Sequence, residues 1–317
     1  MRFSVILPVY NRAASLAPAL ESVLNQTRPA DEILVIDDGS QDDILAALAP
    51  YQGRIRILRQ ANAGVAAARN AAALQATGDW LTFQDSDDLW APTHLESAAR
   101  DLAAAGPETV CHLGDVVYVG DGYAESLFTI KALRFPAGGA ERLTDPLPLV
   151  ISGMTLQAAA IRRDVFARLG GFDTDMRMLS DTAFFCQLAL EGDFLVTADQ
   201  MAQIQRLPGD TESITSLHRK NALYGRQMHV RILARLLPRD LRPDQRKLVN
   251  RMLSGAEFRL AEVLHRSDRV AALRMLLQSA RRHPKPVTGW GKAVLAAVLG
   301  ARGYRHVLDR HSSFDRS

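Results

Sequence analysis

In the stretch WLTFQDSDD, residues 80–88, an apolar run passes almost directly into three carboxylates, which is the pattern of a strand that ends at a site. Residues 80–83 have the pattern of a buried strand, and Asp85, Asp87 and Asp88 follow it at once. Like charges this close repel one another, and burying them is costly unless a positive group lies nearby. The sequence therefore predicts a strand whose carboxyl end lies at a binding site. The site would take a cation, or a ligand that binds together with a cation.

The same arrangement recurs through the first hundred residues, which alternate strand and helix patterns. Apolar runs predict strands over residues 2–9, 32–37, 54–59 and 80–83. Apolar residues at helical spacing predict helices over residues 13–25, 42–49, 64–78 and 92–105. This alternation indicates an α/β fold with a Rossmann-like, open, mostly parallel sheet and flanking helices. In such sheets, ligands bind beyond the carboxyl ends of the strands.

Polar residues follow each predicted strand, and we expect them to lie together at one edge of the sheet. They are Tyr10 and Asn11, residues 37–40, residues 62–69 and residues 85–88. Asp38 can accept hydrogen bonds from a base or ribose. Arg69, in the helix that opens at Gly64, suits a phosphate near the positive end of the helix dipole. The acids of residues 85–88 suit Mg²⁺ or Mn²⁺, which commonly bridge a protein carboxylate to a substrate phosphate.

Each of these residues also has a plainer interpretation. Asp38 suits a polar turn, Tyr10 suits a half-buried aromatic position, and Arg69 suits the surface. The acids after residue 83 could cap the next helix while remaining solvated. Asp181 could likewise be the N-cap of a helix over residues 181–190.

Four segments in series resemble glycosyltransferases of family 2, which have the GT-A fold. They are SVILPVYNRAASLAPALESVLNQT (4–27), EILVIDDGSQDD (32–43), NAGVAAARNAAALQATGDWLTFQDSDDLW (62–90), and GGFD with LSDTAFFCQLAL (170–190). The resemblance covers about the first 210 residues in the right order. It implies an inverting transfer from a nucleotide-diphospho-sugar, with a UDP-sugar favoured, to an acceptor hydroxyl. It also implies a divalent metal, Mn²⁺ or Mg²⁺, that holds the diphosphate.

The resemblance assigns roles to individual positions of this chain. Asp38 matches the aspartate that binds the base, and Asp181 matches the catalytic base of an acid pair. Within the Asp-X-Asp motif, Asp87 matches the metal ligand and Asp85 a contact to ribose or metal. The positions that match the remaining donor contacts are Pro8, Tyr10, Asn11, Asn62, Gly64 and Arg69.

Two positions depart from the family pattern. The acid pair of the family is Ser180-Asp181 here, so that only the second carboxylate is present. Many members also carry an Arg-X-His segment whose histidine helps to hold the metal or diphosphate. This chain has Pro208 where that histidine is expected, and His218 lies too far along the sequence to replace it.

The rest of the chain predicts a shorter α/β part and then helices alone. Strand patterns cover residues 116–119, 127–130, 156–161 and 194–197, and a short helix is expected over residues 165–169. Helical patterns cover residues 245–265, 270–281 and 290–308. We therefore predict a catalytic domain over residues 1–218 and a basic, all-helical region over residues 219–317.

The net charge of +3 conceals a strong asymmetry between these two regions. Residues 1–218 hold 16 Lys and Arg against 28 Asp and Glu, a net charge of −12. Residues 219–317 hold 22 against 7, a net charge of +15. The basic region could lie against an anionic membrane, where lipid-linked acceptors are found, or bind a partner. It could also be a solvated helical cap, which is the interpretation that we favour. It lacks a nucleic-acid-binding module.

Composition limits the class of protein. The 47% hydrophobic and 23% charged residues are ordinary for a globular protein, and two cysteines do not form a disulfide framework. We expect a cytoplasmic protein, with peripheral contact at the inner face of the membrane as an option.

The expected role is synthesis of bacterial surface polysaccharide or glycoconjugate. Alternatives are a degenerate nucleotide-sugar-binding subunit and a metal-dependent nucleotidyltransferase, although no glycine-rich phosphate loop follows the first strand.

Overall fold

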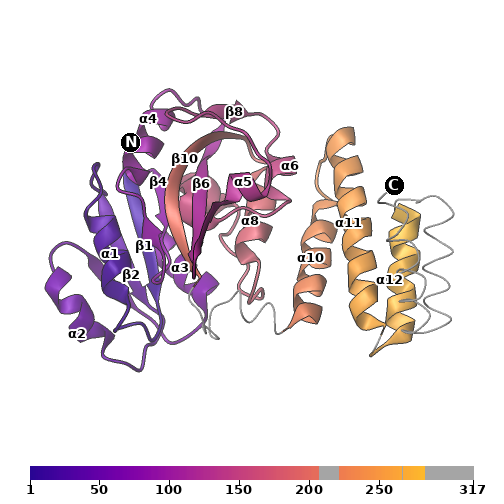
Figure 1. The fold of residues 1–317 in the computed structure, drawn as a ribbon, viewed down its shortest axis with the longest axis horizontal. Coiled ribbons are helices and arrows are strands. Elements are labelled where there is room, and N and C mark those ends of the chain that lie inside the picture. Colours follow the sequence, from indigo (N-terminus) through magenta and orange to yellow (C-terminus); the bar gives the residue numbers. More distant parts are fainter. Residues whose placement is uncertain (207–220, 266, 283–317) are drawn as a thin grey trace. The chain divides into compact units, whose positions relative to one another are not determined.

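The computed structural model describes residues 1–206, 221–265 and 267–282 (Figure 1). The chain divides into two compact units, Met1–Asp210 and Thr211–Ser317. The boundary predicted between residues 218 and 219 lies outside the described residues, as does the helix predicted over residues 290–308.

Within the described residues of the first unit, a mixed sheet of ten strands forms the centre of the fold. Its order is β3-β2-β1-β4-β9-β6-β10-β5, with β7 paired to β6 and β8 paired to β10. The strands are β1 (Phe3–Val9), β2 (Glu32–Asp37), β3 (Arg56–Arg59), β4 (Trp80–Phe83), β5 (Leu89–Trp90), β6 (Thr109–Gly120), β7 (Tyr123–Ser126), β8 (Glu141–Leu143), β9 (Ala159–Arg162) and β10 (Asp193–Arg206).

Helices flank this sheet, as the alternating pattern predicts. They are α1 (Leu16–Leu24), α2 (Ile44–Leu48), η1 (Ala49–Tyr51), α3 (Val65–Gln75), α4 (His94–Leu102), α5 (Leu127–Ile130), α6 (Leu147–Val150), η2 (Leu156–Ala158), α7 (Arg163–Arg168) and α8 (Ser180–Leu188). Helix α3 packs against β1 and β2, whereas α4 packs against β6 and β10. The predicted α/β class is confirmed.

The first four strands run parallel, with β1 in the middle. All seven residues of β1 are buried, as expected of a strand covered on both faces. Pro8 lies within β1 opposite Ile36. The carbonyl of Ile6 accepts the N–H of Gln84, which follows β4. Residues two apart on a strand direct their backbone groups to the same side, so the nitrogen of Pro8 also faces the β4 side. It lies beyond Ile6 and Phe83, the last residues that pair between β1 and β4. The missing N–H therefore breaks no hydrogen bond of the ladder.

Several predicted elements differ from the observed ones. Residues 127–130 form the short helix α5 rather than a strand, because Ser126 Oγ caps it through the N–H of Thr129 and Asp115 Oδ1 accepts the N–H of Phe128. Strand β10 extends to Arg206, well past the predicted residues 194–197. Helix α3 ends at Gln75, and Gly78 is not its cap.

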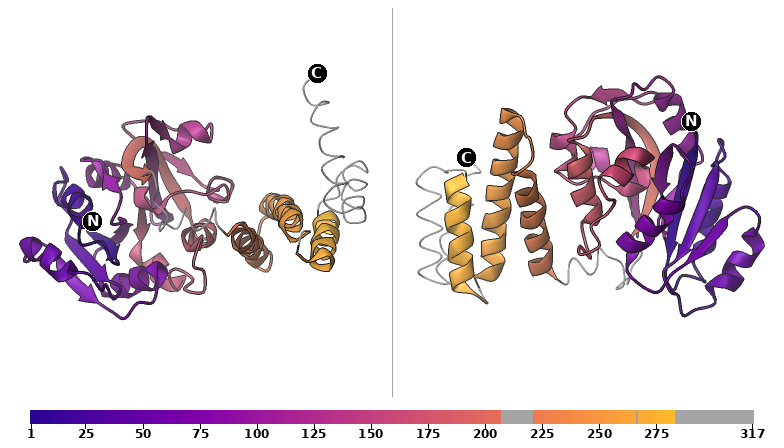
Figure 2. Two further views of the ribbon diagram at one scale, coloured as in Figure 1. Left: turned by 60° about the horizontal axis from the view of Figure 1, so that its bottom comes forward. Right: turned by 180° about the vertical axis from the view of Figure 1, so that it is seen from behind.

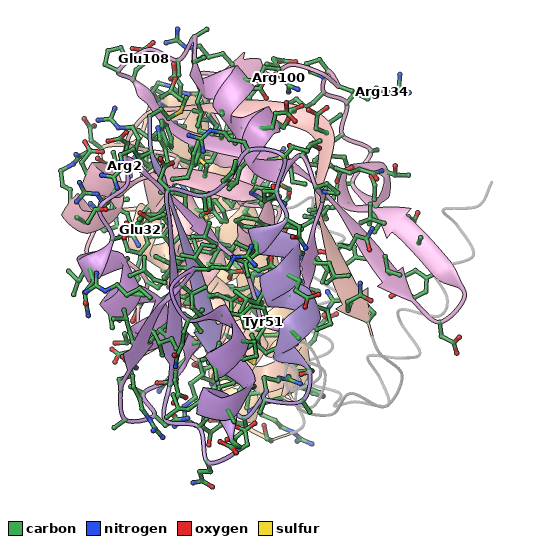
Figure 3. The ribbon with its side chains drawn as sticks, turned by 90° about the vertical axis from the view of Figure 1, so that its left-hand side faces the viewer. Arg2, Glu32, Tyr51, Arg100, Glu108 and Arg134 are labelled. Atoms are coloured by element: carbon green, nitrogen blue, oxygen red, sulfur yellow. The ribbon has the colours of Figure 1, made fainter. Side chains whose placement is uncertain are left out.

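Gly78 is needed for a different reason. A Cβ at this position would lie 2.8 Å from the backbone nitrogen of Ser4, where β1 begins. The glycine therefore lets the chain that leaves α3 approach the start of β1. Figure 3 shows Arg2 and Glu32 near one another at this amino-terminal end of the strands. Although desolvation raises the pKa of Glu32, hydrogen bonds from Ser4, Thr77 and Gly78 outweigh it and lower that pKa.

Three helices form the described part of the second unit: α10 (Ala222–Leu236), α11 (Pro243–Leu264) and α12 (Arg269–Arg282). Helix α11 packs against both α10 and α12 (Figures 1 and 2). Helix α10 is not predicted as a separate element by the sequence pattern. Ser254 and Ser279 hydrogen-bond across α11 and α12, and Arg282 pairs with the buried Glu257 at 2.8 Å.

The turn after β2 depends on a glycine. Gly39 has a φ of 78°, and a Cβ there would lie 2.7 Å from the backbone nitrogen of Asn62. The β2 turn and the loop after β3 therefore approach backbone to backbone at the carboxyl edge of the sheet.

We predict that Gly39→Ala lowers the free energy of unfolding by about 2 kcal/mol or more, because left-handed strain adds to overlap with immobile backbone. Gly53→Ala is a matched control, since Gly53 has a φ of 83° but nothing lies within 4 Å of its Cβ position. This control should lose only about 1 kcal/mol. Urea-induced unfolding measures both values, and equal losses would contradict the close approach.

Candidate active site

The turns after β1 and β2 are bonded to each other. The N–H of Asn11 donates to Ser40 Oγ at 3.0 Å, and Asn11 Oδ1 accepts from the N–H of Gln41 at 2.8 Å. Asn11 has a φ of 51°, which asparagine tolerates better than most residues. Asn11 therefore shapes this edge of the sheet. The neighbouring Tyr10 is exposed, and its ring is accessible for stacking on a base.

Asp38 is buried and holds the loop that precedes α3. Its Oδ1 accepts from Gln60 Nε2 at 2.7 Å and from the N–H of Ala63 at 2.9 Å, and its Oδ2 accepts from the N–H of Gly64 at 2.8 Å. A carboxylate offers about four acceptor positions, so a ligand can still bind to Asp38. Asp38 therefore also sets the conformation of the loop that carries the exposed Asn62.

Arg69 lies on α3 and is only 5% exposed, so the alternative of a surface arginine is wrong. Its Nη2 is hydrogen-bonded to Asp85 Oδ1, and its guanidinium carbon lies 5.8 Å from the centre of the Phe172 ring. A guanidinium this deeply buried needs an acid partner. Arg69 and Asp85 therefore form a largely buried ion pair at the end of β4.

Gln157, in η2, joins two of the three acids. Its Nε2 donates to Asp85 Oδ2 at 2.7 Å and to Asp88 Oδ2 at 3.0 Å. Asp88 Oδ1 also accepts from the N–H of Gln205 at 2.9 Å, so β10 is bonded to the acid loop as well. Nothing in the sequence pattern marked Gln157.

Asp88 does not cap the helix that follows, as one interpretation predicted, because Thr93 is at the N-cap of α4. It is buried instead. Desolvation, together with the charges on Asp85 and Asp87, raises the pKa of Asp88 to about 8. A third negative charge beside Asp85 and Asp87 is therefore unfavourable, and Asp88 is mostly protonated at neutral pH.

Asp87 is the most exposed of the three acids, with 37% of its side chain accessible. Its Oδ2 lies 3.5 Å from Nη2 of Arg12, another contact that the sequence analysis missed. Among the described residues, no three His, Cys, Asp or Glu side chains are arranged to hold a metal ion. Mg²⁺ commonly takes one or two carboxylates and completes its shell with substrate phosphates and water. Asp87, with Asp85 second, fits a divalent ion held in this way.

Asp181 is brought to the same place from nearly a hundred residues away. It is the second residue of α8, and the N-cap is Leu179, with a φ of 63°, so the N-cap alternative for Asp181 is wrong. Its Oδ1 accepts the N–H of Thr182 at 2.7 Å. Desolvation raises the pKa of Asp181, and the charge on Asp85 adds to this, whereas Thr182 and Arg69 oppose it. Asp181 therefore lies in the field of the Arg69–Asp85 pair.

An aromatic cluster supports these charged groups. Phe172 has neighbours on three elements: Phe83 on β4, Phe166 on α7 and Phe184 on α8, with ring centres 5.1 to 5.3 Å away. Asn70, next to Arg69, binds the backbone of Phe172 through both a donated and an accepted hydrogen bond. The cluster therefore ties α8, and with it Asp181, to α3 and β4.

The other side of the acids is lined by the ends of β6 and β10. The guanidinium of Arg206 lies over the ring of Tyr118, 4.8 Å from its centre. Arg206 directly precedes the segment in which the family histidine is expected, and both Pro208 and His218 lie outside the described residues.

The family profile of glycosyl transferase family 2 matches residues 4–170. This match spans more than half of the chain and includes β1 to β9. The chain belongs to glycosyl transferase family 2.

Relatives of this family 2 chain have been described in several bacteria. It is 29% identical over 194 residues to an uncharacterized glycosyltransferase of Haemophilus influenzae, an alignment that covers 60% of this chain and 63% of that protein. It is 47% identical over 97 residues to an uncharacterized glycosyltransferase of Rickettsia felis, covering 30% of this chain and 16% of that protein. The chain thus spans less than two thirds of either relative.

Solved structures show the same fold. Staphylococcus aureus TarS 1–349, in complex with UDP-GlcNAc, superposes with a TM-score of 0.70 and 20% identity, covering 99% of the family 2 chain and 92% of that chain. The mannosyltransferase PcManGT from Pyrobaculum calidifontis, in complex with GDP-Man and Mn²⁺, has a TM-score of 0.54 and 21% identity, covering 100% and 88%. At these identities the likeness establishes the GT-A fold.

We predict that Gln157→Leu lowers the free energy of unfolding by about 2 kcal/mol, because two carboxylates of the site lose a shared donor. The exposed Gln203 on β10 provides a matched control, and Gln203→Leu should change stability by less than about 0.5 kcal/mol. Urea-induced unfolding measures both. Equal stability of the two variants would show that the Gln157 bridge contributes nothing.

Proposed function

We propose that this chain is an inverting glycosyltransferase that moves a sugar from a nucleotide-diphospho-sugar, with a UDP-sugar favoured, to an acceptor hydroxyl. The observation that carries the proposal is the convergence of Asp38, Arg69, Asp87 and Asp181 at one edge of the sheet. Membership of family 2 supports it, as does the likeness to TarS, which was solved with UDP-GlcNAc. We place the reaction in the synthesis of bacterial surface polysaccharide or glycoconjugate.

The donor would bind across the carboxyl ends of β1, β2 and β4. Tyr10 would stack on the base, Asp38 would accept its N–H, and the loop of Asn62 and Gly64 would follow the ribose and diphosphate. A divalent metal held by Asp87, with Asp85 close by, would supply positive charge to the leaving diphosphate. Arg69 would add a fixed positive charge at no cost in reorganisation.

Asp181 would act as the general base. It takes the proton from the acceptor hydroxyl as that oxygen attacks the anomeric carbon, while the bond from that carbon to the diphosphate oxygen breaks. Attack opposite the leaving group inverts the anomeric carbon. Because desolvation raises the pKa of Asp181, its carboxylate is a stronger base than that of an ordinary aspartate. The charge on Asp85 raises this pKa further, whereas the charge on Arg69 lowers it.

The basic helical unit offers a second proposal, which concerns location. Helix α12 buries the small residues Ala272 and Ser279 and exposes Val270, Leu273 and Leu277 on another face. Arginines at positions 269, 274 and 281 are exposed along the same helix. Apolar side chains flanked by arginines suit an anionic lipid surface. Within the described residues, no helix is long and apolar enough to cross a membrane.

We predict that Asp181→Asn abolishes sugar transfer but retains nucleotide-sugar binding, because the amide cannot accept the proton. Asp87→Ala should instead lose the Mn²⁺-dependent part of donor binding. A panel of UDP- and GDP-sugars tested by thermal shift with and without Mn²⁺ measures binding, and nucleotide release measures transfer. Full activity of Asp181→Asn would refute the assigned base. A wild-type chain that binds donors but releases no nucleotide would favour the degenerate binding subunit.

We also predict that the full-length chain floats with vesicles containing anionic phosphatidylglycerol, but not with neutral phosphatidylcholine vesicles. Leu273→Ser combined with Leu277→Ser should reduce flotation severalfold, and high salt should weaken it because the arginine contribution is screened. A chain that stays in the soluble fraction with anionic vesicles at low salt would rule out the membrane contact.

A further inference from the structure

The hairpin of β6 and β7 shares one face with the end of β10. Residues paired across neighbouring strands project to the same side of a sheet, and so do residues two apart on one strand. Tyr118 pairs with Glu125 on β7, and Gly120 pairs with both Tyr123 and Arg206. Tyr118, Tyr123, Glu125 and Arg206 therefore project from one face.

The contacts agree with this register. The guanidinium of Arg206 lies over the Tyr118 ring, and the ring of Tyr123 lies across Gly120, in the space that a Cβ would take. An aromatic ring on a cross-strand glycine is a stable arrangement that leaves its other side open. Tyr123 is 49% exposed, which is unusual for a large apolar side chain.

This face borders the proposed base and the acid loop. Gln205, beside Arg206, donates its N–H to Asp88 at 2.9 Å. Burial raises the pKa of Tyr118, and the charges on Asp181 and Asp88 raise it further, whereas Arg206 lowers it. Tyr118 therefore lies within the electrostatic field of Asp181 and Asp88, and the aromatic face continues from it along the hairpin to Tyr123.

The order of the strands separates this face from the donor. The proposed donor contacts follow β3, β2, β1 and β4, whereas β6 and β10 lie beyond β9 in the sheet. An inverting displacement brings the acceptor to the side of the anomeric carbon opposite the diphosphate. The acceptor must therefore approach from the side of β6 and β10.

The chemistry of the face selects the kind of acceptor. Sugar rings present C–H faces that pack on aromatic rings and hydroxyls that bind charged side chains, and tyrosine offers both an apolar ring and a polar tip. Tyr118 and Tyr123 supply the rings, and Arg206 and Glu125 supply charges of both signs. A lipid chain would need a continuous apolar surface, which this alternation of residues does not offer.

We propose that the face of β6, β7 and β10 that carries Tyr118, Tyr123 and Arg206 is the acceptor-binding surface, and that it takes a carbohydrate whose sugar ring stacks on Tyr123. This inference rests on the proposed function, because it assigns the second substrate of the same site. Tyr123 binds a sugar unit beyond the one that reacts, since Tyr118 lies nearer to Asp181.

The test begins with binding, which does not require catalysis. The labelled full-length chain, with UDP and Mn²⁺, is applied to an array of immobilised bacterial and synthetic glycans. We expect binding by the wild type, about tenfold weaker binding by Tyr123→Ala, and binding restored in Tyr123→Trp. Tyr51→Ala is the matched control, since Tyr51 (Figure 3) lies in η1, just before the edge strand β3 at the far end of the sheet. It should bind like the wild type.

Kinetics then separate this inference from the proposed function. With the best-bound glycan as soluble acceptor, Tyr123→Ala should raise the KM for that acceptor about tenfold and leave the KM for the UDP-sugar within twofold. Equal binding and an equal acceptor KM in Tyr123→Ala and the wild type would overturn the acceptor surface, while transfer itself would stand. Glycan binding that depends on Tyr123 in a chain without transfer activity would overturn the proposed function, while the carbohydrate-binding surface would stand. Absence of glycan binding in the wild type would overturn the surface outright.

Discussion

The burial of one positive charge, the guanidinium of Arg69, is the constraint on which the site depends. An arginine only 5% exposed requires a carboxylate partner, and Asp85 supplies it from the end of β4. Helix α3 is then held at three points: Asp38 binds its first turn through Gly64, Arg69 binds Asp85, and Asn70 binds Phe172. A single short helix therefore links Asp38 at the end of β2, Asp85 at the end of β4 and the segment that precedes α8.

This arrangement divides the acids by role. Asp85 and Asp88 are engaged by Arg69, Gln157 and the backbone of β10, which keeps them in place. Asp87 is the most exposed of the three acids and lies 3.5 Å from Arg12, so it is the acid that we propose as the main ligand of a cation. Asp181 belongs to a different element and reaches the site only because the phenylalanine cluster packs α8 against β4. In the function that we propose, the parallel strands would bind the donor and the strands beyond β9 would bind the acceptor.

Local pattern predicted the strands at residues 32–37 and 80–83 with their exact bounds, because continuous apolar runs that end in polar residues have few other solutions. It failed at residues 127–130, where a serine cap and a distant aspartate favour a helical turn over an apolar strand. It also misread Gly78 as a helix cap, since the close approach of β1 cannot be seen along the chain.

The sequence by itself determined which edge of the sheet would be polar and which residue types would gather there, because strand ends and side-chain alternation are local properties. Only the tertiary structure decided that Arg69 is buried, that Gln157 joins Asp85 to Asp88, and that Tyr118 and Arg206 lie on one face beside Asp181. The contact of Arg69 with Asp85 joins residues 16 apart in the sequence, and that of Gln157 with Asp85 joins residues 72 apart. They exist because the packing of α3, η2 and α8 on the sheet brings those side chains together, and no local preference encodes that packing.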